Sequence, residues 1–261
     1  MEYETIQFER SNGIARLVLN RPEKLNAFNV LMHREVSTAL GAVEADESLR
    51  VLLVTGRGRA FCAGQDLSER NVDEGPLDLG ATTRTYYNPL VKRLVSLKIP
   101  TLCAVSGAAA GAGVSLALAC DIVVARASAK FVQAFSSIGL VPDAGGSYWL
   151  PRMIGQARAL GFTLLGQSLS ARQAETWGLI WKAIEDENFE EEVETLVMQL
   201  AGAATRGLSA AKAAIRAAAR NTLEQQLDLE SASQFECGRT LDYKEGVTAF
   251  RERRAPQFSG R

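Results

Sequence analysis

The chain has 261 residues, of which 47% are hydrophobic and 23% charged. This length suits one large domain, or one domain with an appendage, and the composition is that of an average soluble protein. A disordered chain, a collagen-like fibre and a disulfide-dense miniprotein are excluded. Lys and Arg number 29 against 30 acids, a net charge of -1. No overall field attracts nucleic acid or an anionic membrane, so neither is expected as a partner, although a local basic patch stays open.

A single histidine, His33, limits the chemistry further. Multi-histidine metal sites are excluded, and a Ser-His-Asp triad would have to use this residue. His33 lies in an amphipathic helical pattern, which favours a packing role. The four cysteines are Cys62, Cys103, Cys120 and Cys237. No two of them have CxxC spacing, so neither a zinc knuckle nor a thioredoxin-type motif is predicted. No metal site is predicted.

The first ten residues, MEYETIQFER, are unlike a signal or transit peptide. The most apolar stretch, 104–125, contains glycines and serines and is interrupted by Asp121. It is therefore interpreted as a buried core segment rather than a membrane span. A cytoplasmic location is expected.

The first half of the chain alternates between strand-like and helical patterns. Alternation around Asn12-Gly13 predicts a β-hairpin. The patterns that follow predict, in order, a helix at 29–45, a strand at 50–56, a helix at 84–97, a strand at 101–107, a helix at 110–119 and a strand at 120–125. This order implies an α/β core.

From about residue 153 the periodicity becomes helical. Helices are predicted at 156–165, 170–177, 188–204, 207–220 and 222–253, with only 178–184 extended. No glycine- or proline-rich linker precedes the last segments. We therefore divide the chain into a core, residues 1–195, and a C-terminal helical region, residues 196–261, packed on the core or on a neighbouring subunit.

Three glycine-bearing segments stand out: 60–67, 106–121 and 136–152. None is a P-loop, and the GxGxxG order of a dinucleotide site is missing. The first two place small residues where a strand gives way to a helix, where free backbone N–H groups favour a negative oxygen. Two such turns would form an oxyanion hole. The alternative, that these glycines serve only close packing, has about equal weight.

Five segments in order carry a family resemblance: RPEKLNAFN (21–29), AFCAGQDL (60–67), SGAAAGAGVSLALACDIVVA (106–125), IGLVPDAGGSYWLPR (138–152) and LLGQSLSARQAETWGLI (164–180). Over essentially its whole length the chain resembles the enoyl-CoA hydratase/isomerase (crotonase) superfamily. The resemblance implies a crotonase-like spiral of ββα units with a C-terminal helical trimerisation region. It also implies a homotrimer or a dimer of trimers, acting on an acyl-CoA thioester. Coenzyme A would be part of the substrate, with no separate cofactor.

The same resemblance assigns the site. The backbone N–H groups of Gln65 and Ala112 would form the oxyanion hole. The CoA-binding residues would be Arg21, Lys24, Ala27, Ala63, Asp66 and Leu67, with Lys244 and Phe250 as further candidates from the same or an adjacent subunit. The acyl pocket would be formed by Tyr87, Phe135, Leu140 and Trp149.

Hydratases of this family carry two glutamates, whose positions here hold Ser115 and Phe135. Neither side chain acts as a carboxylate, which argues against hydration of a simple enoyl-CoA. Asp143 remains. It is interpreted either as the N-cap of the next helix or as a carboxyl group whose pKa is raised by apolar neighbours for general acid/base work. In isomerase-like branches of the family an aspartate at this position is the catalytic base.

Further segments resemble the ring-epoxide isomerases of bacterial phenylacetate degradation, which convert 2-(1,2-epoxy-1,2-dihydrophenyl)acetyl-CoA to oxepin-CoA. These are 62–76, 83–100, 131–152 and the tail from Leu241. The alternatives are a Δ3-Δ2-enoyl-CoA isomerase of fatty-acid-type substrates and a non-catalytic crotonase-fold scaffold. A benzoyl-CoA dehalogenase would need a further histidine, and His33 lies in another segment.

Overall fold

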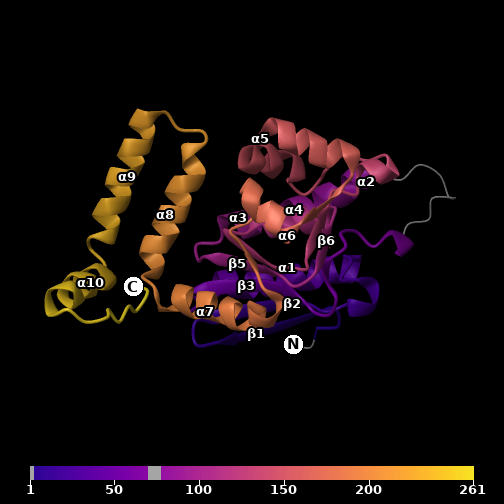
Figure 1. Ribbon diagram of the computed structural model, residues 1–261. Coiled ribbons are helices and arrows are strands. Elements are labelled where there is room, and N and C mark those ends of the chain that lie inside the picture. The colour runs from indigo at the N-terminus through magenta and orange to yellow at the C-terminus, as the bar shows by residue number, and fades with distance from the viewer. Residues whose placement is uncertain (1–2, 70–77) are drawn as a thin grey trace.

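The computed structural model describes residues 3–69 and 78–261. Within them the larger sheet has six strands in the order β1-β2-β3-β5-β7-β10 (Figure 1). Their bounds are β1 (Ile6–Ser11), β2 (Ile14–Leu19), β3 (Val51–Gly56), β5 (Thr101–Val105), β7 (Ile122–Arg126) and β10 (Lys182–Ile184). Only the β1–β2 pair is antiparallel in this sheet. The hairpin between them turns through Asn12 and Gly13, both at positive φ, as the Asn-Gly signal predicts.

A smaller sheet pairs four short strands of the described chain in the order β4-β6-β8-β9. These are β4 (Ala60–Cys62), β6 (Ala108–Ala110), β8 (Lys130–Val132) and β9 (Ser168–Ser170). The first three are parallel, and β9 runs antiparallel to β8. The successive pairs β3–β4, β5–β6 and β7–β8 each give one strand to the large sheet and one to the small. This repetition confirms the α/β class and the spiral of ββα units.

The α-helices of the described chain pack on the sheets or, at the C-terminal end, extend from them. They are α1 (Val30–Ala45), α2 (Leu79–Thr82), α3 (Asn88–Ser96), α4 (Ala112–Ala119), α5 (Gly146–Leu165), α6 (Ala171–Trp177), α7 (Phe189–Gly202), α8 (Thr205–Ala218), α9 (Leu223–Cys237) and α10 (Leu241–Glu252). The main core includes side chains of the β-sheets, α1, α3 and α4. A second apolar cluster joins α7 to the large sheet through Phe189, Val193 and Val197.

Several elements differ from their predictions. The short strands β4, β6, β8 and β9 were not predicted, and the segment predicted as extended, 178–184, is a strand only from Lys182, after Gly178 ends α6 in the left-handed conformation. Helix α5 begins ten residues before the predicted start and breaks at Gly155, which has φ 76° and ψ 159°. The segment 222–253 is two helices, since Thr240 caps a new helix after Gly238.

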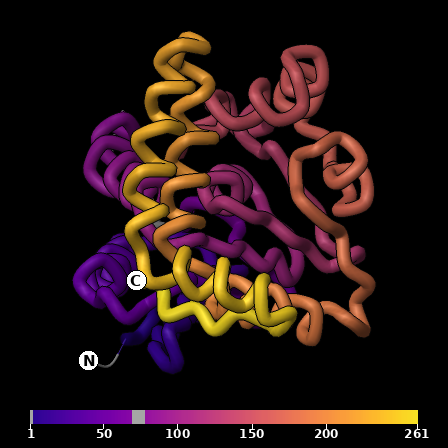
Figure 2. The backbone as a smooth tube through the Cα atoms, turned by 90° about the vertical axis from the view of Figure 1, so that its left-hand side faces the viewer, coloured from indigo at the N-terminus to yellow at the C-terminus, as the bar shows by residue number. Residues whose placement is uncertain are grey.

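The C-terminal helices extend from the core. Helices α8 and α9 lie side by side, and α10 turns back beneath them (Figures 1 and 2). Asp121, just before β7, joins α8 to the core through ion pairs of 2.7 Å with both Lys212 and Arg216. Arg50 donates hydrogen bonds to the carbonyl oxygens of Ala203 and Phe258, which fastens the chain end. The division at residue 195 stays a prediction, and α7 runs through that position.

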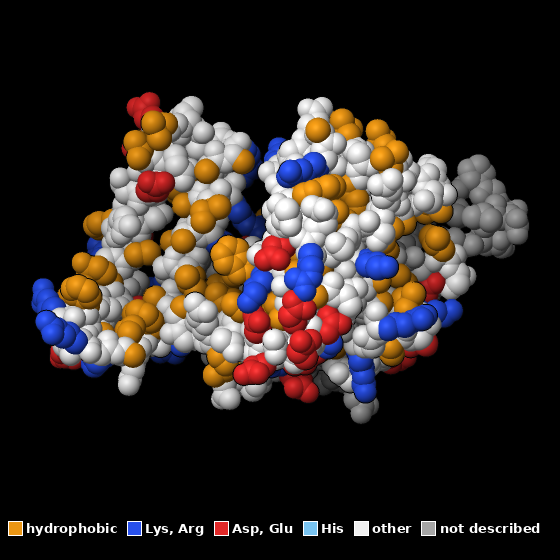
Figure 3. All heavy atoms as spheres, viewed as in Figure 1, with side chains coloured by type: hydrophobic (Ala, Val, Ile, Leu, Met, Phe, Trp, Pro, Cys, Tyr) orange, Lys and Arg blue, Asp and Glu red, His pale blue; other side chains and the backbone are white. Residues whose placement is uncertain are grey.

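Apolar side chains lie exposed along this C-terminal arm (Figure 3). The large ones are Ile215, Leu223, Leu227, Phe235, Leu241, Tyr243 and Phe250. In residues 3–69 and 78–261, no helix combines the length and the hydropathy that a bilayer crossing requires.

Candidate active site

The carboxyl ends of the parallel strands β4, β6 and β8 meet at one edge of the small sheet. The segments that follow them begin at Ala63, Gly111 and Gln133. A Cβ atom on Gly64 would lie 3.0 Å from the carbonyl oxygen of Ala110 and 3.3 Å from the amide nitrogen of Ala112. Gly64 also has φ +91°, a conformation that favours glycine. The close approach brings the two segments that carry the predicted oxyanion donors into contact.

The two predicted donors are free to bind a ligand oxygen. Ala112 is the first residue of α4, so its N–H has no intrahelical partner. Throughout the described residues, no acceptor faces the backbone N–H of Gln65 or of Ala112. Two free N–H groups at neighbouring turns have the chemistry of an oxyanion hole. The assignment of this role stays a prediction.

Gly113 and Cys62 lock α4 against β4. A Cβ atom on Gly113 would lie 2.3 Å from the carbonyl oxygen of Cys62, so only glycine permits this approach. The Cys62 thiol lies directly behind the turn and accepts a hydrogen bond from the N–H of Gly64. Burial raises the pKa of this thiol to about 12. Cys62 is therefore an inert packing residue and not a nucleophile.

The six predicted CoA-binding residues lie on two segments that are joined backbone to backbone. Leu25 accepts a hydrogen bond from Ala63 N–H, and Phe28 N–H donates to Gly64 at 2.7 Å. Phe28 in turn accepts from Asp66 N–H. The structure thus brings segment 21–28 alongside segment 63–67, as the resemblance requires.

Within these segments Arg21 and Asp66 form a partly buried ion pair at 3.0 Å. Arg21 also donates to the carbonyl oxygen of Ala27 at 2.6 Å. Burial alone would raise the pKa of Asp66, but hydrogen bonds from Ser68 and from Arg21 lower it below its ordinary value. Lys24 and Leu67 are exposed. Of the two cations in these segments, Lys24 is therefore the one exposed to solvent, whereas Arg21 joins the two segments through its ion pair.

Asp143 lies in a turn with two successive residues at positive φ, Ala144 at 48° and Gly145 at 85°. The N-cap of α5 is Gly145, and no side chain caps that helix, so the capping interpretation of Asp143 is wrong. The Oδ1 atom of Asp143 is buried without a hydrogen-bond partner in the part of the chain that the structure describes. Burial raises the pKa of this carboxyl from 3.8 to about 6.

The predicted acyl-pocket residues fall into two places. Phe135 is buried with its ring near Gly111, and Leu140 donates its N–H to the Phe135 carbonyl oxygen, so both lie in the loop that leads to Asp143. Trp149 lies one turn into α5, over Gly145. Tyr87 is instead fully buried against Phe28, the residue bridged to Gln65.

His33 is a packing residue, as predicted. Its ring lies 4.5 Å from that of Tyr87 and 4.8 Å from that of Phe28, centroid to centroid. The side chain is 5% exposed. No catalytic role follows from this place.

The sequence did not reveal that the polar atoms of several side chains near these segments are buried. Gln133, just after β8, is 0% exposed, and neither of its amide atoms has a partner within the described chain. Ser115 Oγ, Gln65 Oε1 and Trp149 Nε1 are buried and unpaired over the same residues. The available signal for Gln133 was a glutamine inside the apolar run FVQAF.

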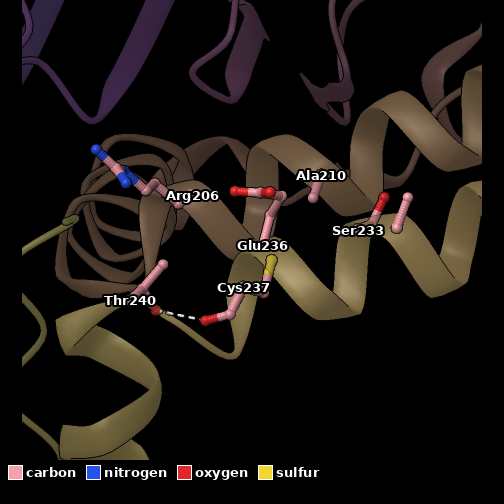
Figure 4. Close-up of a pocket in the computed structure, with 7 residues that line it drawn as sticks. Arg206, Ala210, Ser233, Glu236, Cys237 and Thr240 are labelled. Atoms are coloured by element: carbon pink, nitrogen blue, oxygen red, sulfur yellow. Dashed lines mark hydrogen bonds between the residues drawn. The ribbon is translucent and has the colours of Figure 1, made fainter.

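Two cavities lie away from this edge. One of about 360 Å³ lies among α8, α9 and α10, with Arg206, Glu236 and Cys237 in its lining (Figure 4). Another of about 490 Å³ is lined by Arg59, Lys130 and other residues at the amino ends of β4, β6 and β8. The latter is at the opposite end of the small sheet from the glycine turns.

Comparison with known proteins shows the family. Residues 9–261 match the enoyl-CoA hydratase/isomerase family. A relative from Escherichia coli K12, a 1,2-epoxyphenylacetyl-CoA isomerase, is 53% identical over 95% of this chain and 96% of its own. A Rhodobacter capsulatus relative named "Probable enoyl-CoA hydratase" is 46% identical over the whole of both chains. The solved structure of a Cupriavidus metallidurans enoyl-CoA hydratase/isomerase, 31% identical, has a TM-score of 0.91 over 100% of this chain and 98% of that one.

Proposed function

Because the chain belongs to the enoyl-CoA hydratase/isomerase family, whose members are enzymes, we propose that it isomerises 2-(1,2-epoxy-1,2-dihydrophenyl)acetyl-CoA to oxepin-CoA. The relative with 53% identity carries that class of activity in its name. The observation that carries the proposal is which positions of the site hold a carboxyl group and which do not. Asp143 is half-buried, with its Oδ1 atom out of contact with solvent, and burial raises its pKa to about 6. The two positions that match the hydratase glutamates hold Ser115 and Phe135.

The reaction begins with the thioester oxygen between the two free backbone donors. The N–H groups of Gln65 and Ala112 donate to this oxygen, and they bind it more strongly as negative charge develops on it. The acyl carbon next to the thioester is thereby made more acidic. Because both donors are backbone groups, no side chain has to ionise to supply this stabilisation. The contact between Gly64 and Ala112 fixes the positions of the two segments that carry them.

Asp143 then moves one proton. A carboxyl group with a pKa of about 6 is largely ionised at neutral pH, yet it is basic enough to accept a proton from carbon and acidic enough to return it. The electron pair released from the acyl carbon is delocalised into the thioester and the ring. The ring C–C bond that the epoxide shares breaks while both C–O bonds remain, which expands the ring to a seven-membered oxygen heterocycle, and Asp143 returns the proton to a ring carbon. Substrate and product have the same atoms, as an isomerisation requires.

Segments 21–28 and 63–67 hold the CoA part of the substrate in this proposal. Lys24 is exposed and meets a CoA phosphate, whereas the Arg21–Asp66 pair keeps the two segments together. Backbone groups of Ala27 and Ala63 and the exposed Leu67 contact the remainder of CoA. CoA enters as part of the substrate and leaves as part of the product, so no separate cofactor is needed.

A second candidate, a Δ3-Δ2-enoyl-CoA isomerase, is favoured by the same observation. Moving a double bond along an acyl chain also needs one carboxyl group and one oxyanion hole. Both reactions are tested with purified protein, by following the phenylacetyl-CoA ring epoxide and a cis-3-enoyl-CoA by liquid chromatography. A scaffold without catalytic activity turns over neither.

The decisive variant is Asp143→Asn. We expect it to lower turnover by about 10³-fold, the usual contribution of a general acid/base. Binding of phenylacetyl-CoA, measured by calorimetry, should stay nearly unchanged because the CoA segments are intact. Asp228→Asn, on the exposed face of α9, is the matched control. Full activity of Asp143→Asn would contradict the mechanism.

A further inference from the structure

Two buried hydrogen-bond donors lie against Gly145 and Gly146, the glycines that follow the Asp143 turn, and the mechanism above does not use them. They are the indole N–H of Trp149 and the hydroxyl of Ser115. Neither has a partner in residues 3–69 or 78–261, and Ser115 is 0% exposed. An unpaired buried donor is destabilising, so two of them near one turn call for a physical reason.

Both donors pack against the adjacent glycines that follow the Asp143 turn. A Cβ atom on Gly145 would lie 2.7 Å from Trp149 Nε1. A Cβ atom on Gly146 would lie 2.7 Å from Ser115 Oγ. Any larger residue at position 145 would displace the Trp149 indole, and any larger residue at position 146 would displace the Ser115 hydroxyl. The glycine pair therefore allows one donor from α5 and one from α4 to approach the same turn.

The two donors differ from their surroundings in chemistry. Phe135, one of the predicted acyl-pocket side chains of this region, is buried and apolar, and the Ser115 hydroxyl lies three residues along α4 from the oxyanion donor Ala112. An indole N–H only donates, so its partner must be an acceptor. A hydrocarbon acyl group leaves both donors unpaired, whereas an acyl group with its own oxygen supplies an acceptor.

We propose that Trp149 Nε1–H and Ser115 Oγ–H form a subsite for an ether or epoxide oxygen carried by the acyl group. The inference rests on the proposed function and deepens it, because it names the residues that favour an oxygen-bearing ring over a plain enoyl chain. Such selectivity follows when a site holds buried donors that only one of two substrates satisfies.

A pair of unreactive ligands tests the subsite. Tetrahydrofuran-2-ylacetyl-CoA and cyclopentylacetyl-CoA differ by one ring oxygen in place of a CH₂ group. Calorimetry should show that the wild-type protein binds the ether about tenfold more tightly, the effect of one net hydrogen bond. Trp149→Phe and Ser115→Ala should each reduce this preference, and the double variant should abolish it. Affinity for the cyclopentyl ligand should change by less than about twofold.

Trp181→Phe is the matched control, since Trp181 is 70% exposed and the substitution makes the same chemical change. The control should keep the full ether preference. The melting temperature of each variant checks its folding. It should not fall in Ser115→Ala, whose hydroxyl has no partner within the described chain, and it should fall modestly in Trp149→Phe, because the indole packs against the core.

The outcomes separate the two proposals. Turnover of the ring epoxide without an ether preference overturns the subsite and leaves the proposed function intact. An ether preference without turnover of either substrate overturns the proposed function and supports the subsite. Equal loss of affinity for both ligands in Trp149→Phe and Ser115→Ala would assign these side chains to packing and overturn the subsite.

Discussion

At the scale of single residues, the chemistry of Asp143 follows from where its backbone places it. The turn through Ala144 and Gly145 at positive φ holds the carboxyl group in a half-buried position, and within the described chain its Oδ1 atom has no hydrogen-bond donor to stabilise a charge. A carboxylate in such a place is held at a cost in folding free energy. The same burial that imposes this cost raises the pKa of the carboxyl group into the range suited to proton transfer.

This cost predicts that Asp143→Asn is more stable than the wild type at alkaline pH. The pKa rises from 3.8 in the unfolded chain to about 6 in the folded protein, so folding favours the protonated form. The associated stability is complete below pH 3.8 and is lost as the pH rises through about 6. About two pKa units correspond to roughly 3 kcal/mol. Urea unfolding should show Asp143→Asn more stable by up to this amount at pH 8.

At pH 4.5 the advantage of Asp143→Asn should fall to roughly 1 kcal/mol, about a third of its value at pH 8. Asp228→Asn, which replaces an exposed carboxylate, should show no such pH-dependent difference. A constant difference between wild type and Asp143→Asn at both pH values would mean that the Asp143 carboxyl is not destabilised by burial.

The sequence predicted candidate residues of the site where a motif carries them, but it did not predict which residues they pair with. Gln65, Ala112 and Asp143 were each predicted from local segments. The pairing of Arg21 with Asp66 was missed, because 45 positions separate the two and only the fold joins their segments. The buried Gln133 was missed because a polar residue beside a strand is ordinarily exposed.

At the scale of elements, the contact between β4 and α4 places the two backbone donors. We expect Gly113→Ala to push α4 away from Cys62, because its Cβ would lie 2.3 Å from a carbonyl oxygen. Overpacking of this kind costs about 1–3 kcal/mol, and it also displaces the N–H of Ala112. Turnover should fall at least about tenfold, the effect of weakening one oxyanion donor.

The control for that variant is Gly161→Ala. Gly161 lies inside α5, and among the residues that the structure describes no atom outside the backbone of that helix lies within 4 Å of an added Cβ. Alanine has the higher helix propensity, so this protein should be more stable by roughly 0.5–1 kcal/mol and fully active. Equal turnover in Gly113→Ala and Gly161→Ala would show that the position of α4 does not govern the reaction.

The C-terminal helices depend on Asp121 for their attachment. Its carboxylate is 13% exposed, accepts from Thr101 and pairs with Lys212 and Arg216. Asp121→Ala leaves two cations without their partner, a change that costs about 3–5 kcal/mol when an ion pair is buried. Chemical denaturation should show a loss near the lower end, since Arg216 is one quarter exposed. Asp228→Ala should be neutral, and equal stability of the two variants would contradict this role of Asp121.

Sequence predicted elements well where periodicity was long. The hairpin predicted around Asn12-Gly13 is present, and helix α1 matches its predicted range of 29–45 closely. Strands β4, β6 and β8 have three residues each and lie next to glycine-rich turns, so they show no alternation. Their pairing depends on contacts between distant segments, which is why the small sheet emerged only in the structure.

At the scale of the whole molecule, the C-terminal arm carries apolar surface that a single chain leaves open. Leu227 is 52% exposed and Phe235 is 61% exposed, both on α9. We predict that this surface binds further copies of the chain in a trimer or a dimer of trimers. Leu227→Glu combined with Phe235→Glu should lower the mass measured by light scattering.

The matched control carries Thr38→Glu on the exposed face of α1, away from that arm. It should keep the mass of the wild type. A monomeric wild-type protein, or an unchanged mass of the α9 double variant, would contradict assembly through this surface.

The balanced charge and the single histidine are also properties of the whole molecule, and they limit the groups that can act in catalysis. A chain without a histidine-rich centre is left with backbone donors and one carboxyl group as the means of catalysis in this account. The measurement that tests this most directly is the pH dependence of kcat/KM for the ring epoxide. We predict a single rise with its midpoint near pH 6, where Asp143 loses its proton, and no such step in Asp143→Asn. A flat profile through pH 6, or the same step with full activity in Asp143→Asn, would contradict the account.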